Sequence, residues 1–264
     1  MIKGRAKAAL RSRYWLLVGT LFVAALLDGS SAAGVISNSR GAAEEFAPGI
    51  WETVRNYVLA FFDGNTHGTV TVTPNTRVTI IAIAAAAILF KVFVSNPVAV
   101  GARRVSLEAY RGEPFLFGEL FFAFKNGDYS RIVTAMFLRE LILLVPAVVM
   151  LAAALFVESA LVKYTVFAAG MVIVLVLSLG LGQVESLLAD DRVSRGISSQ
   201  GVLSGSWELM RGRKLELFIF GLSFIGWQML SAITGGIVGV FWYAPYEEIA
   251  LAGWYSECAN VEAV

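Results

Sequence analysis

Histidine and cysteine are almost absent from this chain of 264 residues, which contains one of each. The single Cys258 excludes an intrachain disulfide and any metal site built from several cysteines. His67 lies in a loop-like segment and has no second histidine with which to form a zinc site, and nothing around it indicates a catalytic triad. GxGxxG, P-loop and HExxH motifs are also absent. We therefore predict no metal ligands, no cofactor-binding residues and no catalytic residues, and we expect the protein not to be an enzyme.

Charged side chains are scarce as well. They make up 16% of the residues, while 57% are hydrophobic and the mean hydropathy is +0.70; soluble domains contain about 25% charged residues. The net charge of +1 provides no field for binding nucleic acid. Several apolar runs approach the ~20 residues that a helix needs to cross a bilayer. The composition predicts an all-α, polytopic membrane protein that forms a single integral membrane domain.

Six apolar segments are predicted to cross the membrane, with amphipathic elbow helices at its surface. They cover residues 14–29, 78–95, 138–157, 164–184, 215–233 and 237–255. Five bases and no acid precede the first segment, so the positive-inside rule places the N-terminus in the cytoplasm. An even number of spans returns the C-terminus to the same side. A cleaved secretory signal peptide is the alternative interpretation of residues 1–33, which end in small residues.

The longest polar region lies between the first two spans, at residues 30–76. Between Asp28 and Arg77 there are five acids and three bases. This negative balance is the one tolerated on the outer side of the membrane, because the positive-inside rule concerns basic residues in cytoplasmic loops. We therefore expect this region to be extracytoplasmic.

The stretch WELMRGRKLELFIFGLSFIGW, residues 207–227, joins a charged segment directly to an apolar run. A soluble amphipathic helix would interleave the two classes at a spacing of about 3.6 residues. We interpret the stretch as an elbow, in which an amphipathic helix at residues 199–212 lies on the inner membrane surface and the fifth span follows. Val202, Leu203 and Met210 are expected to face the membrane together with a tryptophan. The predicted interfacial anchors are Trp207, Arg211, Arg213 and Lys214; a solvated charge cluster is the alternative.

Glu247 and Glu248 lie near the middle of the sixth predicted span, whereas nearly all other charges lie at span ends. A carboxylate that faces lipid at this depth is costly, so at least one should face the bundle interior or a cavity. Pro245 should kink the helix and free a carbonyl near residue 241. Buried, such a glutamate would have a raised pKa and form a candidate proton or cation site. The alternative is an earlier start of the span, which would bring both carboxylates to the inner headgroups.

Several motifs together point to one family. They are RAKAALRSRYW, NPVAVGARR, ELFFAFKNGDYSRIVTAMFLREL and SWELMRGRKLELF…LSFIGW followed by APY. In combination they resemble the bacterial integral-membrane family named domain of unknown function 975. The resemblance implies a six-helix protein of the bacterial cell membrane with cytoplasmic elbows, and it implies no established activity. The chain departs from the expected pattern at Glu247 and Glu248, where uncharged residues would follow Pro245-Tyr246.

Three classes of function remain. We expect a non-enzymatic accessory, assembly or resistance module that acts through contacts with membrane lipids, other membrane proteins or a second copy of itself. The alternative is a transporter or channel for a small or amphiphilic solute. An intramembrane enzyme is disfavoured because the spans contain no histidine, no paired aspartates and no metal-ligand spacing. A cavity that reaches Glu247 or Glu248 would favour transport, whereas a filled core would favour the accessory module.

Overall fold

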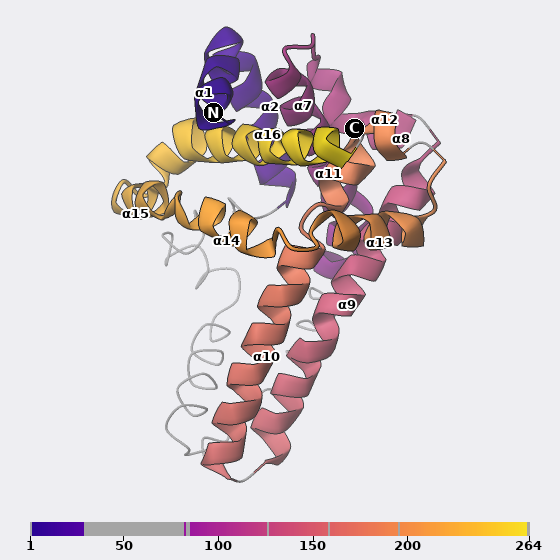
Figure 1. The fold of residues 1–264 in the computed structure, drawn as a ribbon, viewed down its shortest axis with the longest axis vertical. Helices are drawn as coiled ribbons and strands as arrows, with labels where there is room; N and C mark the ends of the chain where they lie inside the picture. The colour runs from indigo at the N-terminus through magenta and orange to yellow at the C-terminus, as the bar shows by residue number, and fades with distance from the viewer. Residues whose placement is uncertain are drawn as a thin grey trace.

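The computed structural model describes residues 2–28, 82, 85–125, 127–157, 159–194 and 196–262, and all secondary structure among them is helical. The all-α prediction is thus confirmed for the described part of the chain. The predicted polar region at residues 30–76, with His67, lies outside the described residues. Figure 1 shows a head of short helices from which one long helical hairpin projects, and both ends of the chain lie in the head.

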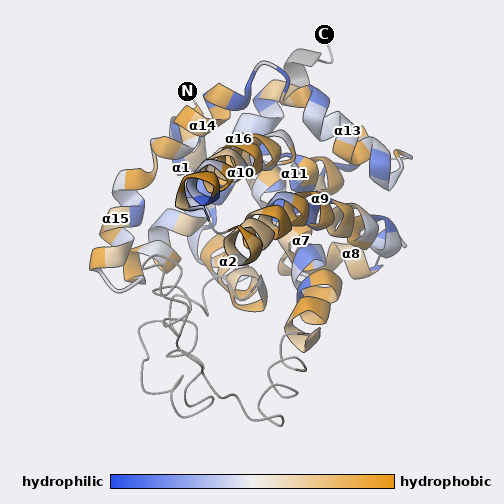
Figure 2. Ribbon diagram, turned by 90° about the horizontal axis from the view of Figure 1, so that it is seen from below, coloured by the Kyte–Doolittle hydropathy of each residue, from blue (hydrophilic) through white to orange (hydrophobic). Residues whose placement is uncertain are grey.

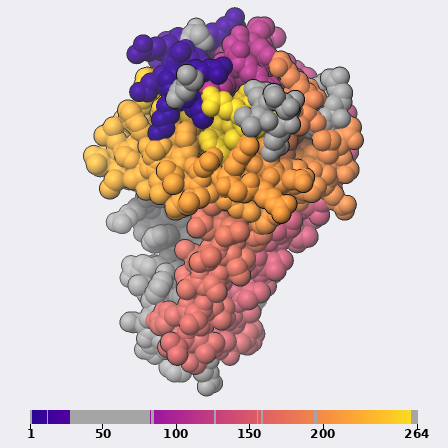
Figure 3. Space-filling model, viewed as in Figure 1, coloured from indigo at the N-terminus to yellow at the C-terminus, as the bar shows by residue number. Residues whose placement is uncertain are grey.

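The projecting hairpin is formed by α9 (Tyr129–Phe156) and α10 (Ala160–Gly180), which contain the predicted spans 138–157 and 164–184. It protrudes below the head in Figure 3. Only 22% of the most apolar stretch of α9 is buried, and only 17% of that of α10. Gly170 allows the two helices to approach closely, because a Cβ there would lie 2.4 Å from Met150 Sδ. Exposed apolar surface of this extent requires lipid or a protein partner to cover it.

The helix that contains Pro97 is continuous, whereas the second predicted span ends at residue 95. It runs from Ala85 to Arg111 and includes a π-helical turn, η1 (Lys91–Ser95), followed by α7 (Asn96–Arg111). Proline has no N–H for the carbonyl four residues earlier, and its ring crowds that carbonyl. The wider π turn relieves the crowding, and the Tyr129 hydroxyl donates a hydrogen bond to the freed Phe93 carbonyl at 2.8 Å.

A second proline helix near the C-terminus repeats this arrangement. The π-helical turn η3 (Gly239–Tyr243) precedes α16 (Ala244–Glu262), in which Pro245 is the second residue. The Tyr14 hydroxyl donates a hydrogen bond to the Phe241 carbonyl, four residues before Pro245, at 2.7 Å. The freed carbonyl predicted from the sequence is therefore present, and a tyrosine satisfies it.

Replacing Tyr14 with phenylalanine is expected to destabilise the protein by about 0.5–1.5 kcal/mol, because the Phe241 carbonyl loses its hydroxyl donor. The measurement is thermal unfolding in detergent, followed by tryptophan fluorescence. Tyr164→Phe is the matched control, because Tyr164 is 59% exposed on the projecting hairpin. Equal melting temperatures for Tyr14→Phe and the parent would contradict a stabilising role of this hydrogen bond.

Among the described residues, four helices are long and apolar enough to cross a membrane, or up to five if one bent pair counts as a single span. The four are Ala85–Arg111, Tyr129–Ala154, Ala160–Ala189 and Lys214–Ile233. The bent pair is α1 (Ile2–Ser12) and α2 (Tyr14–Asp28), which meet at 100°. These helices cover the predicted first, third, fourth and fifth spans and the described part of the second span.

The predicted sixth span, residues 237–255, is not among these helices, and six spans are therefore not found in the described part of the chain. Its helix, α16, carries Glu247, Glu248 and Glu257, which lower its hydropathy. Ile249 and Ala250 at its centre are fully buried, and they pack with Leu10 of α1 in one apolar cluster. The apolar run of α16 thus faces protein, and hydropathy alone does not distinguish a protein core from lipid.

The fifth predicted span, 215–233, consists of two helices, α14 (Lys214–Leu222) and α15 (Ile225–Ile233), that lie across the base of the head. In Figure 2, seen from below, α9 and α10 are viewed end-on whereas α14 and α15 are seen lengthwise. The remaining elements of the head are η2 (Phe117–Phe121), α8 (Phe122–Lys125), α11 (Val184–Ala189), α12 (Asp191–Ser194) and α13 (Ser199–Leu209).

The basic residues of α1 that predicted the orientation of the chain also pack against the head. Ala6 and Leu10 on the same helix are fully buried. Three basic side chains of α1 lie over aromatic rings: Lys3 over Phe224, Arg5 over Tyr110 and Lys7 over Tyr246, at 4.5 to 5.8 Å from the ring centres. Arg13, directly after α1, lies over Phe115 at 5.8 Å. Cation–π contacts of this kind stabilise by about 0.5–1 kcal/mol each at exposed sites, so α1 is held in the fold by charge as well as by burial.

Candidate functional site

A charged network joins four helices inside the head. Arg103 of α7 reaches Glu248 of α16, with Nη1 3.0 Å from Oε2, and Glu185 of α11, with Nη2 3.5 Å from Oε2. Arg139 of α9 lies 2.9 Å from the other oxygen of Glu185. The Arg103 side chain is only 9% exposed. A buried arginine requires such partners, because the attraction of the carboxylates offsets the cost of removing its charge from water.

Further ion pairs continue along α7 away from this network. Arg104 pairs with Glu108 one turn later, at 3.2 Å, and with Asp191 at 2.6 Å. Arg111 pairs with the buried Asp190 at 2.5 Å. These contacts tie α7 to Asp190 and to the start of α12, and none of these side chains lines the cavity described next. We therefore interpret these ion pairs as contacts that stabilise the fold.

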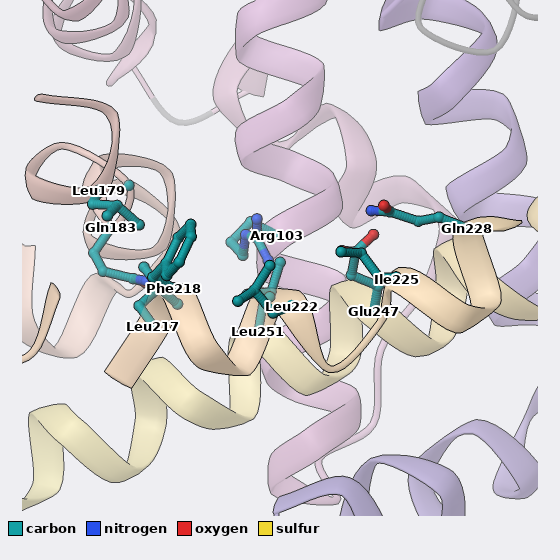
Figure 4. Close-up of a pocket in the computed structure, with 12 residues that line it drawn as sticks. Arg103, Leu179, Gln183, Leu217, Phe218, Leu222, Ile225, Gln228, Glu247 and Leu251 are labelled. Atoms are coloured by element: carbon teal, nitrogen blue, oxygen red, sulfur yellow. The ribbon is translucent and has the colours of Figure 1, made fainter. Parts of the chain in front are cut away.

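An open cavity of about 420 Å³ lies beside Arg103, between α14, α15, α16 and the end of α10 (Figure 4). Its polar side chains are Arg103, Gln183, Gln228 and Glu247, and its apolar walls are Leu179, Leu217, Phe218, Leu222, Ile225 and Leu251. Cavities that bind small molecules generally have about 300–1,000 Å³ and a few polar groups among apolar walls. The arrangement therefore suits a molecule with a polar head and an apolar body.

Glu247 is the sequence-predicted candidate that lines this cavity. Gln228 Nε2 donates a hydrogen bond to the Tyr243 hydroxyl at 2.7 Å, and that hydroxyl donates to the Glu247 carboxyl. Figure 4 shows the Gln228 and Glu247 side chains converging from α15 and α16. Burial raises the pKa of the Glu247 carboxyl above its ordinary value, although the Tyr243 hydrogen bond and the charge of Arg103 oppose this shift. The carboxyl can therefore exchange a proton at a higher pH than an exposed glutamate.

Glu248, the second candidate, does not line the cavity but pairs with Arg103. Adjacent helical residues point about 100° apart, which is why the two carboxylates meet different neighbours. Arg103, Gln183 and Gln228 were not singled out from the sequence. Arg103 is one of four charged residues of α7, with Arg104, Glu108 and Arg111, so no signal in the sequence sets it apart, and neither glutamine carried one.

The four predicted anchors lie near the junction of α13 and α14. Lys214 Nζ lies 3.6 Å from the centre of the Trp207 ring, which is 40% exposed. Arg213 donates a hydrogen bond to the Cys258 carbonyl at 3.4 Å, and Arg211 is exposed. The structure thus brings Trp207 and Lys214 together, while Arg213 is directed toward the C-terminal helix.

The apolar side of the predicted elbow helix requires a correction. A helix is present, as α13, but its predicted membrane-facing residues Val202, Leu203 and Met210 are 2%, 9% and 0% exposed and belong to the main apolar core. They face protein rather than lipid. An amphipathic pattern shows that one side of a helix is covered, but it does not show by what.

The comparisons with known proteins bear on most of this structure. A family model described as protein of unknown function (DUF975) matches residues 37–262, which include every residue that lines the cavity. No curated protein and no solved structure matches the chain. Within the described ranges, no three histidine, cysteine, aspartate or glutamate side chains are grouped so that they could hold a metal ion.

Proposed function

This chain belongs to the DUF975 family of proteins of unknown function, and we propose that it is a non-enzymatic bacterial membrane protein that binds and carries a small amphiphilic solute. The observation that supports this proposal is the cavity of about 420 Å³ that reaches Glu247. A module that acts only through surface contacts has no need of such a space. The expectation of a purely accessory role therefore becomes the second candidate.

The placement of the cavity fits a solute that arrives from the membrane. α14 and α15, which border it, lie at the base of the head, where the hairpin with its exposed apolar surface begins (Figure 1). We place the head, with both ends of the chain, on the cytoplasmic side of the cell membrane, because α1 carries basic residues and no acid. An amphiphile in the inner leaflet would then lie level with the cavity.

Filling the cavity is expected to abolish binding. Gly221 lines it, and a Cβ at this position would meet no atom within 4 Å, so Gly221→Leu adds a side chain to open space. The full-length protein in lipid nanodiscs is labelled with a twelve-carbon glucoside that carries a photoreactive diazirine, and the labelled peptides are identified by mass spectrometry. We expect the variant to lose roughly 90% of the labelling of α14 and α16, since a blocked cavity cannot bury the ligand. Labelling of α9 and α10, which face lipid, should not change.

Gly226→Leu is the matched control. Gly226 also has no atom within 4 Å of its Cβ, but it does not line the cavity. Labelling of α14 and α16 should be retained in this variant. If α14 and α16 of the parent protein are labelled no more than α9 and α10, the proposal that the cavity binds a solute is wrong.

The accessory role remains the second candidate because the hairpin exposes a large apolar surface. Its partners would be membrane proteins, lipids or a second copy of the chain. Affinity purification of the tagged protein from native membranes tests it. A stoichiometric protein partner whose binding is unaffected by Gly221→Leu would favour this role over solute binding.

A further inference from the structure

We infer that α14 and α15 lie flat in one leaflet of the membrane instead of crossing it, and that lipid acyl chains cover their exposed apolar face. The partner of this surface is the lipid of the leaflet on the side of the head. The inference rests on the membrane location proposed above, but not on solute binding. It assigns the fifth predicted span, residues 215–233, to the membrane interface.

The first observation is the direction of this helix pair relative to the hairpin. In Figure 1 the hairpin of α9 and α10 runs down from the head, whereas α14 and α15 extend across the base of the head. Figure 2 looks along the hairpin and shows α14 and α15 lengthwise. α10 has 21 residues, and at 1.5 Å per residue its length of about 31 Å matches the hydrocarbon core of a bilayer. A bilayer that the hairpin crosses along its length therefore has α14 and α15 in its plane.

The second observation is the apolar face that the pair leaves exposed. Leu217 and Phe224 are buried in the apolar clusters of the head. The other side carries six large apolar residues that are 45% to 82% exposed, and we call them the apolar stripe: Leu215, Ile219, Leu222, Ile225, Met229 and Ile233. Successive members are three or four residues apart, which places them on one side of a helix. Only 6% of the most apolar part of Lys214–Ile233 is buried, less than in either hairpin helix, so the stripe needs a cover other than water.

The polar residues of the pair do not interrupt the stripe. Gln228 donates a hydrogen bond to the Tyr243 hydroxyl, and Ser223 accepts one from Lys3. Lys214 and Glu216 are the only charged residues of the pair, and both lie at the start of α14. A helix on a water-exposed surface turns its polar side outward. Here the outward side is apolar, which is typical of a helix whose outer surroundings are lipid.

The third observation indicates the level of the membrane surface. Trp207 packs against the end of α10, since a Cβ on Gly180 would lie 2.3 Å from its ring, and Lys214 Nζ lies 3.6 Å from the centre of that ring. Tryptophan is enriched at the membrane–water interface, and lysine side chains extend to the headgroups there. α14 therefore begins at headgroup level. The lipid that surrounds α10 continues at this level across the base of the head, so it covers the stripe without a protein partner.

The test measures the depth of nitroxide spin labels in the full-length protein in lipid nanodiscs. Cys258 is the only cysteine, so Cys258→Ala is the parent for the single variants Leu215→Cys, Ile219→Cys, Met229→Cys and Ile233→Cys. Paramagnetic resonance compares collisions of each label with oxygen, which concentrates in the bilayer, and with a nickel complex that stays in water. We expect all four labels at a similar depth of about 5–10 Å below the headgroups. A helix that crosses would separate Leu215 from Ile233 by about 27 Å along the membrane normal.

Two further labels calibrate the measurement. Val145 is 59% exposed on α9 and lies about 16 Å before the end of that helix, so Val145→Cys should report the centre of the bilayer. Val193 is 43% exposed on α12 in the head, so Val193→Cys should be accessible to the nickel complex. Each labelled variant should keep the melting temperature of Cys258→Ala, which shows that it is folded.

Three results overturn the inference. Labels on the stripe that collide with the nickel complex as often as the label at Val193 would show that water covers the stripe. Labels shielded from both reagents would show that a second copy or another protein covers it. A depth that is greatest midway between Leu215 and Ile233 would show that the helix pair crosses the membrane. If the label at Val145 is itself accessible to the nickel complex, the membrane location is wrong, whereas the photolabelling of the cavity tests solute binding separately.

Discussion

Replacing Arg103 with glutamine is expected to lower the melting temperature of the detergent-purified protein by roughly 6–12 °C, which corresponds to about 3 kcal/mol in a chain of this size. Glu248 and Glu185 lie 3.0 and 3.5 Å from the Arg103 guanidinium. The variant leaves both carboxylates in place and removes the charge that compensates them. Glu185 keeps Arg139, so most of the cost arises at Glu248 and at the junction of α7 with α16.

Arg192→Gln is the matched control, because Arg192 is 65% exposed and pairs with Glu113 at the surface. Exposed pairs contribute about 0–1 kcal/mol, so its melting temperature should stay close to that of the parent. The double variant Arg103→Gln/Glu248→Gln should be more stable than Arg103→Gln alone, because the unmatched carboxylate is removed. A single variant as stable as Arg192→Gln would show that the network does not hold the helices together.

The parts of the fold that follow from local patterns could be predicted from the sequence. The runs at 138–157 and 164–184 lack charge in their middle, and each lies in a long helix whose apolar surface is largely exposed. The carbonyl freed by Pro245 follows from the covalent structure of proline alone. The second predicted span ended at residue 95, before Pro97, but the helix continues to Arg111 because a π turn and the Tyr129 hydroxyl accommodate the proline ring.

The parts that depend on distant contacts could not be predicted. Arg103 and Glu248 are 145 residues apart in the chain, and neither residue by itself indicates the other. The stripe of α13 and the apolar run of α16 were assigned to lipid, but both face protein. Lipid and a protein core are equally apolar, so hydropathy gives the same signal for both. Glu247 was found because a carboxylate within an apolar run is unusual, whereas the glutamines of the cavity are uncharged and carried no such signal.

Replacing Gly101 with alanine is expected to destabilise the protein by about 3 kcal/mol or more, since overpacking against rigid backbone forces two elements apart. Gly101 lies in α7 where this helix contacts η2, and a Cβ added there would lie 1.9 Å from the Leu120 carbonyl oxygen. Backbone cannot rotate away as a side chain can. The separation of η2 from α7 would also expose Leu120, which is fully buried. The measurement is the melting temperature in detergent, together with the yield of monodisperse protein.

Two other glycines provide a graded comparison in the same assay. A Cβ at Gly253 of α16 would lie 2.4 Å from the Tyr110 ring, and a Cβ at Gly19 of α2 would meet no atom within 4 Å. Because a tyrosine ring can shift, Gly253→Ala should cost less than Gly101→Ala. Gly19→Ala should be neutral or stabilising by up to about 1 kcal/mol, since alanine favours the helix. We expect Gly101→Ala to have the lowest melting temperature of the three variants, because only at Gly101 is the obstructing atom a main-chain carbonyl oxygen. A Gly101→Ala variant as stable as Gly19→Ala would show that α7 and η2 do not pack as closely as described.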